Sequence, residues 1–283
     1  MRLAALVAVA AVSSLALVAC EDQGKINEQT ASDELARLAP VVKEDAAQVR
    51  KGLPEGAKKL AALLGPDPGA DLAALQRAIA TARAQVQDLS VAKSTFFSFT
   101  DPSGTVLRSE ADPDLLAGKN VVAAFPALKA ALDPKSGDVE AHGQMQEMRG
   151  VRNGADTAWV VAHPVVVEGQ LKGLFVTGWS YRRFAYHLEE VAKRDLAEAA
   201  QKAEKKQPPI AYVFVVDGDK AYGAPVTPDV DAQAIEALHL VEKTAKGPYK
   251  GALEVTGRPF GVAAERAPEL GDKAVIAVMA SAI

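Results

Sequence analysis

One cysteine and one set of aromatic and polar side chains are the residues of this chain that could do chemistry. Cys20 is the single cysteine among 283 residues, so disulfides and zinc thiolate sites within the chain are excluded. An uncharged apolar run over residues 3–19 precedes it, Arg2 comes before that run, and the acidic pair Glu21 and Asp22 follows the cysteine. A short apolar segment with a basic start and small residues at its end is typical of a secretory signal. A cysteine at that boundary offers a thiol that a lipid can modify.

The four residues that end at Cys20 resemble the lipobox of bacterial lipoproteins. They read Leu17-Val18-Ala19-Cys20, which is leucine, two small or apolar residues and cysteine. The resemblance implies that 1–19 is a signal peptide, that Cys20 carries acyl chains such as palmitate, and that the polar stretch 20–31 is a lipidated tether. A spanning helix is the alternative, but it needs about 20 apolar residues. Several acyl chains hold a protein stably where one does not. We therefore expect an exported protein anchored to a bacterial membrane, on its periplasmic side or at the cell surface.

The second set of residues lies on two neighbouring expected strands. Side chains alternate between the faces of a strand, so one face gathers both tryptophans with a histidine, a tyrosine and threonines, while alanine and valine occupy the other. The aliphatic face is expected to pack against alanine-rich helices. The aromatic face predicts a small-molecule pocket, and Arg149 could bind a carboxylate there. The expected lining is Phe99, Arg149, Trp159, His163, Phe175, Thr177, Trp179 and Tyr181. The alternative, which stays open, is an ordinary aromatic core with a structural histidine.

Helices are expected before these strands, over residues 32–94. Apolar residues recur at helical spacing from Leu35 to Leu53, with Pro40 expected to kink or restart the helix. A second helix is expected over 55–64. A third apolar stripe runs from Leu72 to Leu89 in steps of three and four. It fits either a coiled-coil partner surface or a helix packed on its own domain, and we favour the second because the repeat is short and has alanine in its seam.

Two similar modules follow, at 95–181 and 210–283, joined by a connecting helix over 182–209. Each module reads as a hairpin, a helix and three strands. In the first, Asp101-Pro102-Ser103-Gly104 fits a type I turn, and Asn120 is expected to cap a helix that continues to Leu132. Its last three strands are expected at 139–148, 157–167 and 171–180, whereas the second module has a turn at 217–219 and a helix over 231–246. The prediction is an α+β protein with two lobes, each an antiparallel sheet of about five strands with a helix, on long N-terminal helices.

This order resembles the extracytoplasmic Cache family, in its double-Cache arrangement of two PAS-like lobes on a long N-terminal helix. Residues 99–107 and 112–119 resemble the family's first hairpin and the loop after it. Residues 163–176 resemble its proline-valine strand, turn and glycine-containing strand. The resemblance implies a membrane-distal lobe at 95–181 that captures a small molecule. Amino-acid-binding members carry arginine, tryptophan and tyrosine where this chain has residues 121–126, so that ligand class is not expected.

Composition and motif spacing argue against other classes. The 32 basic and 36 acidic residues nearly balance, so neither nucleic acid nor a polybasic membrane patch is expected. We find no Gly-x-Ser-x-Gly elbow, phosphate-binding glycine loop or His-Glu-x-x-His motif. We therefore expect no catalytic residue and no enzyme activity. Metal-ligand spacing is also lacking among the four histidines, and we expect neither a metal nor a cofactor. These four are His142, His163, His187 and His239.

The leading hypothesis is a lipid-anchored, non-enzymatic sensory or ligand-binding module. Receptors of the Cache family continue into a transmembrane helix and an output domain, whereas this chain ends at Ile283. The resemblance therefore implies no transmembrane output of its own and a separate protein partner in the envelope. The alternative is an envelope interaction or scaffold lipoprotein that has a Cache-like fold and no small-molecule ligand. An unrecognised hydrolase is a third and more distant candidate.

Overall fold

The chain folds into two compact units. A computed structural model describes residues 4–145 and 156–282, with side chains described at 23–144 and 156–282. Unit A comprises Pro40–His187 and Glu269–Asp272. Unit B comprises Met1–Ala39, Leu188–Pro268 and Lys273–Ile283. The expected lobe 95–181 falls within unit A, and the expected lobe 210–283 falls within unit B apart from its residues 269–272.

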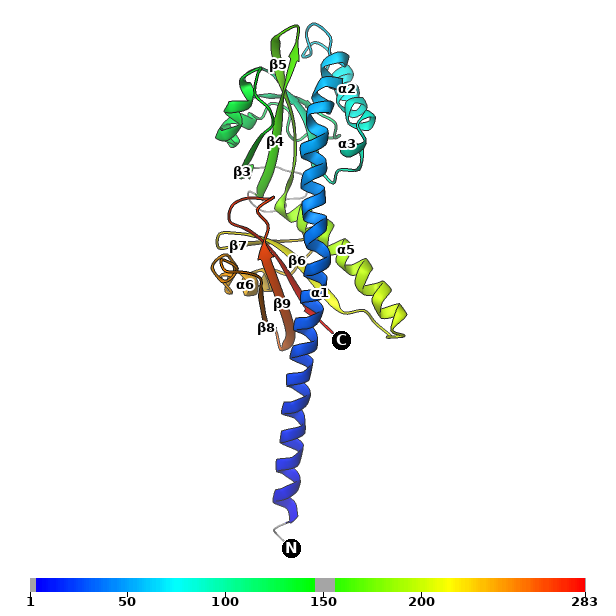
Figure 1. The fold of residues 1–283 in the computed structure, drawn as a ribbon, viewed down its shortest axis with the longest axis vertical. Coiled ribbons are helices and arrows are strands. Elements are labelled where there is room, and N and C mark those ends of the chain that lie inside the picture. The colour runs from blue at the N-terminus through cyan, green and yellow to red at the C-terminus, as the bar shows by residue number, and fades with distance from the viewer. Residues whose placement is uncertain (1–3, 146–155, 283) are drawn as a thin grey trace. The chain divides into compact units, whose positions relative to one another are not determined.

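Unit A is built on an antiparallel sheet of five strands in the order β2-β1-β5-β4-β3 (Figure 1). The strands are β1 (Phe96–Thr100), β2 (Val106–Ser109), β3 (Val139–Met145), β4 (Asp156–Val167) and β5 (Gln170–Ser180). The predicted turn between β1 and β2 is confirmed, because the Gly104 N–H donates to the Asp101 carbonyl at 3.1 Å. Gly104 has a φ of 86°, which glycine adopts without strain. Residues 146–148 of the expected third strand lie outside the described residues.

Unit B repeats this sheet, with strands in the order β7-β6-β10-β9-β8. They are β6 (Ile210–Asp217), β7 (Lys220–Gly223), β8 (Tyr249–Val255), β9 (Arg258–Arg266) and β10 (Ala274–Ser281). The expected turn at 217–219 joins β6 to β7, with Asp217 paired opposite Lys220. Both units therefore use one strand order. This confirms the prediction of two successive modules that each form a five-stranded antiparallel sheet.

Helix α1 (Ala4–Leu63) differs from the prediction of separate N-terminal helices, because it continues through Pro40 and Pro54. In unit A its residues from Val42 to Leu53 carry a buried apolar stripe, and Leu38 is fully buried in unit B. Burial of this stripe offsets the backbone hydrogen bond that each proline removes. A restart of the helix at Pro40 and the separate helix over 55–64 are therefore wrong, whereas a kink at Pro40 stays a prediction.

The tether expected at 20–31 is also part of α1. Asn27 and Ala31 are fully buried in unit B. The Asn27 Nδ2 donates to the Pro259 carbonyl at 2.9 Å, and its Oδ1 accepts from the Ala282 N–H at 2.9 Å. Residues 27–31 thus belong to the folded unit, because a polar side chain that reads as tether in the sequence satisfies strand backbone groups instead.

The apolar stripe of the third expected helix packs within its own unit, as predicted. Helices α2 (Leu72–Gln85) and α3 (Gln87–Val91) carry it. Leu75, Ile79 and Leu89 are at most 3% exposed, whereas Leu72 is 46% exposed. From Leu75 onward, the stripe is therefore part of the core of unit A.

Two helices expected as single elements are broken. Asn120 caps α4 (Val121–Ala124) as predicted, accepting from the Ala123 N–H at 2.8 Å. Pro126 has no N–H to continue that helix, and a 3₁₀ helix, η1 (Pro126–Leu132), follows it. In unit B the helix expected over 231–246 divides where His239 has a φ of 50°. Its two parts are α6 (Asp229–Glu236) and α7 (Leu240–Lys243).

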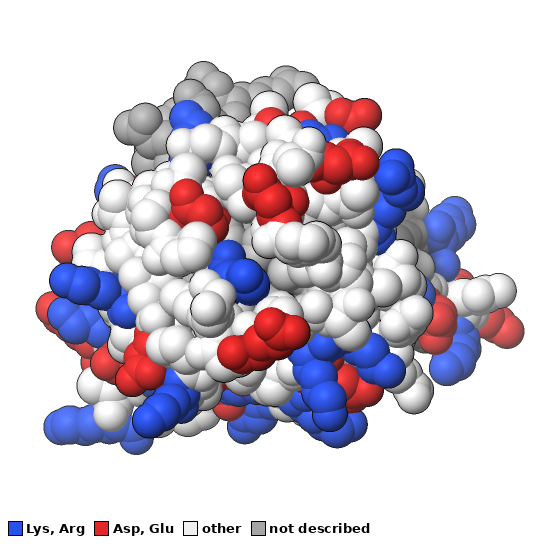
Figure 2. Space-filling model, turned by 90° about the horizontal axis from the view of Figure 1, so that it is seen from above, with Lys and Arg blue, Asp and Glu red and all other residues white. Residues whose placement is uncertain are grey.

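Helices cover both faces of the unit A sheet. Figure 1 shows α1, α2 and α3 on one side of β4 and β5, with the short helices before β3 on the other. The connecting helix α5 (Tyr181–Lys202) follows β5 directly. Positive and negative side chains are interspersed on the face shown in Figure 2, which agrees with the balanced charge of the sequence.

Candidate functional site

The aromatic face predicted from strand alternation exists in unit A. The strand register sets Trp159 opposite Trp179 and His163 opposite Phe175 across β4 and β5. Phe99 of β1 pairs with Phe175 and so joins the same face. Register alone therefore brings together Phe99, Trp159, His163, Phe175, Thr177 and Trp179. Arg149 lies outside the described residues.

Helix α1 covers this aromatic face closely. The Arg50 guanidinium lies over the Trp159 ring, 5.6 Å from its centroid. A Cβ added at Gly56 would lie 2.9 Å from Phe175 Cε1 and 2.5 Å from Leu89 Cδ1. The glycine thus lets the helix backbone approach the ring, and the large aromatic area is removed from water. The expectation that the aliphatic face would meet the long helices is wrong for α1.

The predicted ligand residues on this face are packed against other side chains of the unit. Trp159 and Trp179 have ring centroids 4.4 Å apart, and Phe184 stacks on Trp179 at 4.5 Å. At most 1% of each of six predicted residues is exposed, namely Phe99, Trp159, Phe175, Thr177, Trp179 and Tyr181. The structure thus gives these six a place in the core. Their contact with a ligand stays a prediction.

Three of these six residues also donate hydrogen bonds to other groups of the protein. The Trp159 Nε1 donates to Glu140 Oε2 at 2.9 Å. The Thr177 hydroxyl donates to the Phe96 carbonyl at 2.7 Å, and the Tyr181 hydroxyl donates to the Leu270 carbonyl at 2.7 Å. Buried polar groups of this kind need such partners, so these atoms stabilise the fold before any ligand arrives.

His163 differs from the other predicted residues because it lines a cavity. Its side chain is 20% exposed, and Nδ1 lies 2.7 Å from Asp138 Oδ1. The cavity has a volume of about 220 Å³ and lies between α1, the segment before β3 and the C-terminal part of β4. Lys58 of α1 and Ser136 line it with His163, and the remaining lining is Pro54, Ala57, Ala61, Pro134, Pro164 and Val166. An Nδ1–H held by Asp138 leaves Nε2 as the imidazole atom that can accept from a ligand.

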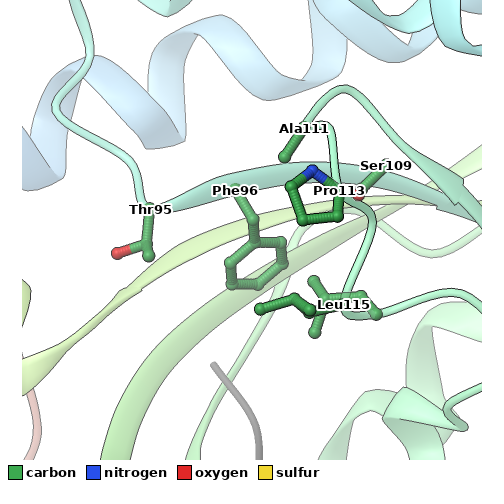
Figure 3. Close-up of a pocket in the computed structure, with 7 residues that line it drawn as sticks. Thr95, Phe96, Ser109, Ala111, Pro113 and Leu115 are labelled. Carbon is green, nitrogen blue, oxygen red and sulfur yellow. The ribbon is translucent and has the colours of Figure 1, made fainter. Parts of the chain in front are cut away.

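The opposite, aliphatic face of the sheet packs on the short helices. Val160, Val176 and Leu174 belong to one buried cluster with Leu128 of η1 and Phe125. A crevice at the edge of this cluster has a volume of only about 20 Å³. In Figure 3 the Phe96 side chain lies beside Pro113 and Leu115, with Thr95, Ser109 and Ala111 around it. A space of this size holds about one water molecule, and a metabolite would need the crevice to open.

Metal-binding clusters and membrane-spanning helices are not found among the described residues. Within the described ranges 4–145 and 156–282, no cluster of three or more His, Cys, Asp or Glu side chains could hold a metal ion. Across those same ranges, no helix combines the length and apolar character needed to cross a bilayer. His187 lies 3.0 Å from Asp45 and packs near Phe184, as a histidine within a packed unit does.

Comparisons with solved structures give the fold a name. The extracellular domain of vpHK1S-Z8, described as a histidine kinase, superposes with a TM-score of 0.55 at 9% identity, covering 92% of this chain and 93% of that one. The fold is that of Cache/PAS-like sensory domains. No protein-family profile and no curated protein matches the sequence.

Two ligand-binding domains of chemoreceptors are also similar, at lower TM-scores. The ligand-binding domain of Pseudomonas aeruginosa PctB, solved with L-Arg, has a TM-score of 0.46 at 16% identity, covering 88% of this chain and 94% of that one. The ligand-binding domain of Campylobacter jejuni Tlp3, solved with L-norvaline, has a TM-score of 0.49 at 10% identity, covering 92% of each chain.

Sequence reasoning found His163 in this Cache/PAS-like fold but missed its neighbours. Asp138 precedes β3, and the pairing of Val139 with Ala162 brings it beside His163. That register could have been inferred only after β3 was aligned with β4. Lys58 comes from α1, and no pattern in the sequence indicates which face of the sheet α1 covers.

Proposed function

We propose that this protein is an extracytoplasmic sensory module that binds a small molecule in unit A. The superposition over 92% of the chain on the extracellular domain of a histidine kinase is the observation that carries the proposal. The cavity beside His163 supports unit A as the place of binding, because it is concave, walled by proline and alanine, and has few polar groups. The Lys58 ammonium favours a ligand with a hydrogen-bond acceptor such as a carboxylate, and the His163 Nε2 favours a hydrogen-bond donor on the same ligand.

Anchoring through Cys20 is the second part of the proposal. It is supported by the lipobox resemblance of residues 17–20 and by the signal-like sequence before them. Acyl chains on Cys20 would hold the domain at one surface of a bacterial membrane. Such chains enter one leaflet only, so we propose that ligand occupancy is passed to a partner protein in the envelope.

A ligand screen tests binding in unit A. We expect native mass spectrometry to detect a co-purified small molecule, and that molecule to raise the melting temperature of the protein. His163→Ala should remove this stabilisation, whereas His239→Ala should not, because His239 is an exposed histidine of unit B. Stabilisation that survives in His163→Ala would rule out the cavity beside His163.

Membrane fractionation tests the anchor separately. We expect the full chain to be recovered with membranes and to incorporate labelled palmitate, and Cys20→Ala to lose both properties. A Cys20→Ala variant that remains membrane-bound would contradict the lipid anchor.

A scaffold lipoprotein without a ligand is the second candidate function. The packed aromatic face and the crevice of about 20 Å³ favour it, because neither has room for a metabolite. A broad metabolite screen that yields no thermal stabilisation and no co-purified molecule would support this candidate over the sensory one.

A further inference from the structure

A second cavity lies in unit B, between α1 and α5, away from the residues assigned to ligand binding above. It has a volume of about 240 Å³. Asp33, Glu34 and Arg37 of α1 line one side. Leu196 and Ala200 of α5 line the other side, together with Ala203 just beyond that helix. The cavity is therefore charged along α1 and apolar along α5, and Lys205, which follows that helix, adds a cation to the lining.

Glu34 is the unusual residue of this groove. Its side chain is only 1% exposed, and its Oε1 pairs with the Arg37 guanidinium. Its other oxygen, Oε2, is buried without a hydrogen-bond partner in the described structure. A buried carboxylate oxygen without a donor is destabilising, because it has lost its hydrogen bonds to water and has gained none in return. The groove thus lacks one donor beside Oε2.

The charges near Glu34 indicate what kind of donor is missing. Burial raises the pKa of Glu34; Arg37 opposes this change, and the carboxylates of Asp195 and Asp33 add to it. Glu34 therefore has two carboxylate neighbours, Asp33 and Asp195, and one guanidinium neighbour, Arg37. A cationic N–H donor would satisfy Oε2 and stabilise the Glu34 carboxylate against its two acidic neighbours.

We propose that this groove binds a small aliphatic amine. Its ammonium donates a hydrogen bond to Glu34 Oε2, and its carbon chain lies along Leu196, Ala200 and Ala203. A water molecule occupies about 30 Å³ in the liquid, so the volume suits a ligand of roughly eight non-hydrogen atoms. A chain of about four methylenes with one or two amino groups fits within that volume and brings a cationic donor to Glu34.

Calorimetric titration of the full chain tests the proposal. The probes are 1,4-diaminobutane and butylamine, with 1-butanol and butyrate as neutral and anionic analogues. We expect both amines to bind and both analogues to bind at least tenfold more weakly. Binding of 1-butanol as tight as that of butylamine, or no binding of either amine at 10 mM, would overturn the proposal.

Variants locate the binding in the groove. Glu34→Gln keeps the size of the side chain and removes its charge, and we expect amine affinity to fall at least tenfold. Ala203→Leu fills the groove from an exposed position, so it should weaken the amines similarly even if Glu34→Gln fails to fold. Glu190→Gln is the control, because Glu190 is 51% exposed on α5 and is not a lining residue. Amine binding unchanged in Ala203→Leu would overturn the proposal. The His163→Ala test of binding in unit A is independent of these outcomes, because it concerns a different ligand and a different unit.

Discussion

Arg50 on α1 donates two parallel hydrogen bonds to the carboxylate of Glu140 on β3. Its Nε lies 2.6 Å from Oε1 and its Nη2 lies 2.9 Å from Oε2. Trp159 Nε1 donates to the same Oε2. The bidentate pair thus joins the helix to the edge strand and orients an indole of the aromatic face. Glu140 is therefore a structural residue that fixes where α1 crosses the sheet of unit A.

Loss of this pair should destabilise unit A. We expect Arg50→Met and Glu140→Gln each to lower the free energy of unfolding by about 1–3 kcal/mol, because each leaves a polar partner unsatisfied. Coupling in a double-mutant cycle should reach only about 1 kcal/mol, since the side chains are 37% and 29% exposed and water screens them. Urea unfolding followed by tryptophan fluorescence measures unit A alone, because both tryptophans lie there. Strictly additive effects would contradict the pairing.

The same pair should make the stability of unit A depend on pH. Burial acts to raise the pKa of Glu140, but the hydrogen bonds from Arg50 and Trp159 and the Arg50 charge outweigh it, so the pKa lies below its usual value. The stabilisation is therefore present above the unfolded-state pKa of about 4.3 and is lost as pH falls through the lower native pKa. The stability gap between wild type and Glu140→Gln should close over that range. A gap that widens at low pH would contradict this sign.

Two glycines of α1 should respond oppositely to alanine. Gly24 has no atom within 4 Å of an added Cβ, so Gly24→Ala should stabilise the helix by up to about 1 kcal/mol. At Gly56 the added Cβ would overlap Leu89 and Phe175, and overpacking costs about 1–3 kcal/mol. Tryptophan fluorescence reports Gly56→Ala in unit A, and far-UV circular dichroism reports Gly24→Ala. A stabilised Gly56→Ala variant would show that α1 does not approach the aromatic face this closely.

Asn27 should be needed for the stability of unit B. Its amide satisfies the Pro259 carbonyl and the Ala282 N–H, and the side chain is fully buried. Asn27→Ala should cost about 1–3 kcal/mol, because it removes the side-chain partner of two backbone groups in part-buried hydrogen bonds. Urea unfolding followed by circular dichroism measures the loss, with Gln29→Ala as control, since Gln29 is exposed and bonds only within α1. Equal stability of the two variants would support the tether that the sequence suggested.

Sequence alone predicted the sheets well, because their signals are local. The turn at Asp101–Gly104, the Asn120 cap and the alternation on β4 and β5 each depend on a few neighbouring residues. Proline was a misleading signal where tertiary packing determined the extent of a helix. Pro40 lies inside α1 because an apolar stripe on both sides of it is buried. Pro126 ended α4, where only one turn of helix preceded it.

The candidate sites were harder to predict, because they depend on contacts between distant segments. His163 was found from strand alternation, but its cavity is formed by Lys58 of α1 and by the segment before β3. Glu34 reads as an ordinary helical residue in the sequence, whereas in the structure it is buried and lines a cavity with residues of α5. No periodicity in the sequence tells which face of a sheet a helix will cover.

The carboxylate of Asp114 organises the loop after β2 in unit A. Its oxygens accept hydrogen bonds from the Ser109 N–H at 2.7 Å, the Ser109 hydroxyl at 2.5 Å, the Leu116 N–H at 3.0 Å and the Ala117 N–H at 3.1 Å. Arg108 Nη1 lies 3.5 Å away, and the Asp114 side chain is 2% exposed. Burial acts to raise the pKa of Asp114, but the Ser109 hydroxyl and the backbone N–H groups outweigh it and the pKa is lowered.

Asp114→Asn should therefore destabilise unit A in a pH-dependent way. The amide turns an N–H donor toward groups that are themselves donors, so we expect a loss of about 3 kcal/mol at pH 7. Because the native pKa of Asp114 is lowered, its carboxylate stabilises unit A at pH values above the unfolded-state pKa of about 3.9. This stabilisation is lost as pH falls through the native pKa. The difference from wild type should shrink steadily below pH 4 in urea unfolding followed by tryptophan fluorescence. Asp112→Asn, an exposed change in the same loop, should leave stability within about 0.5 kcal/mol at every pH. If Asp114→Asn and Asp112→Asn behave alike at pH 7, the Asp114 carboxylate does not hold this loop.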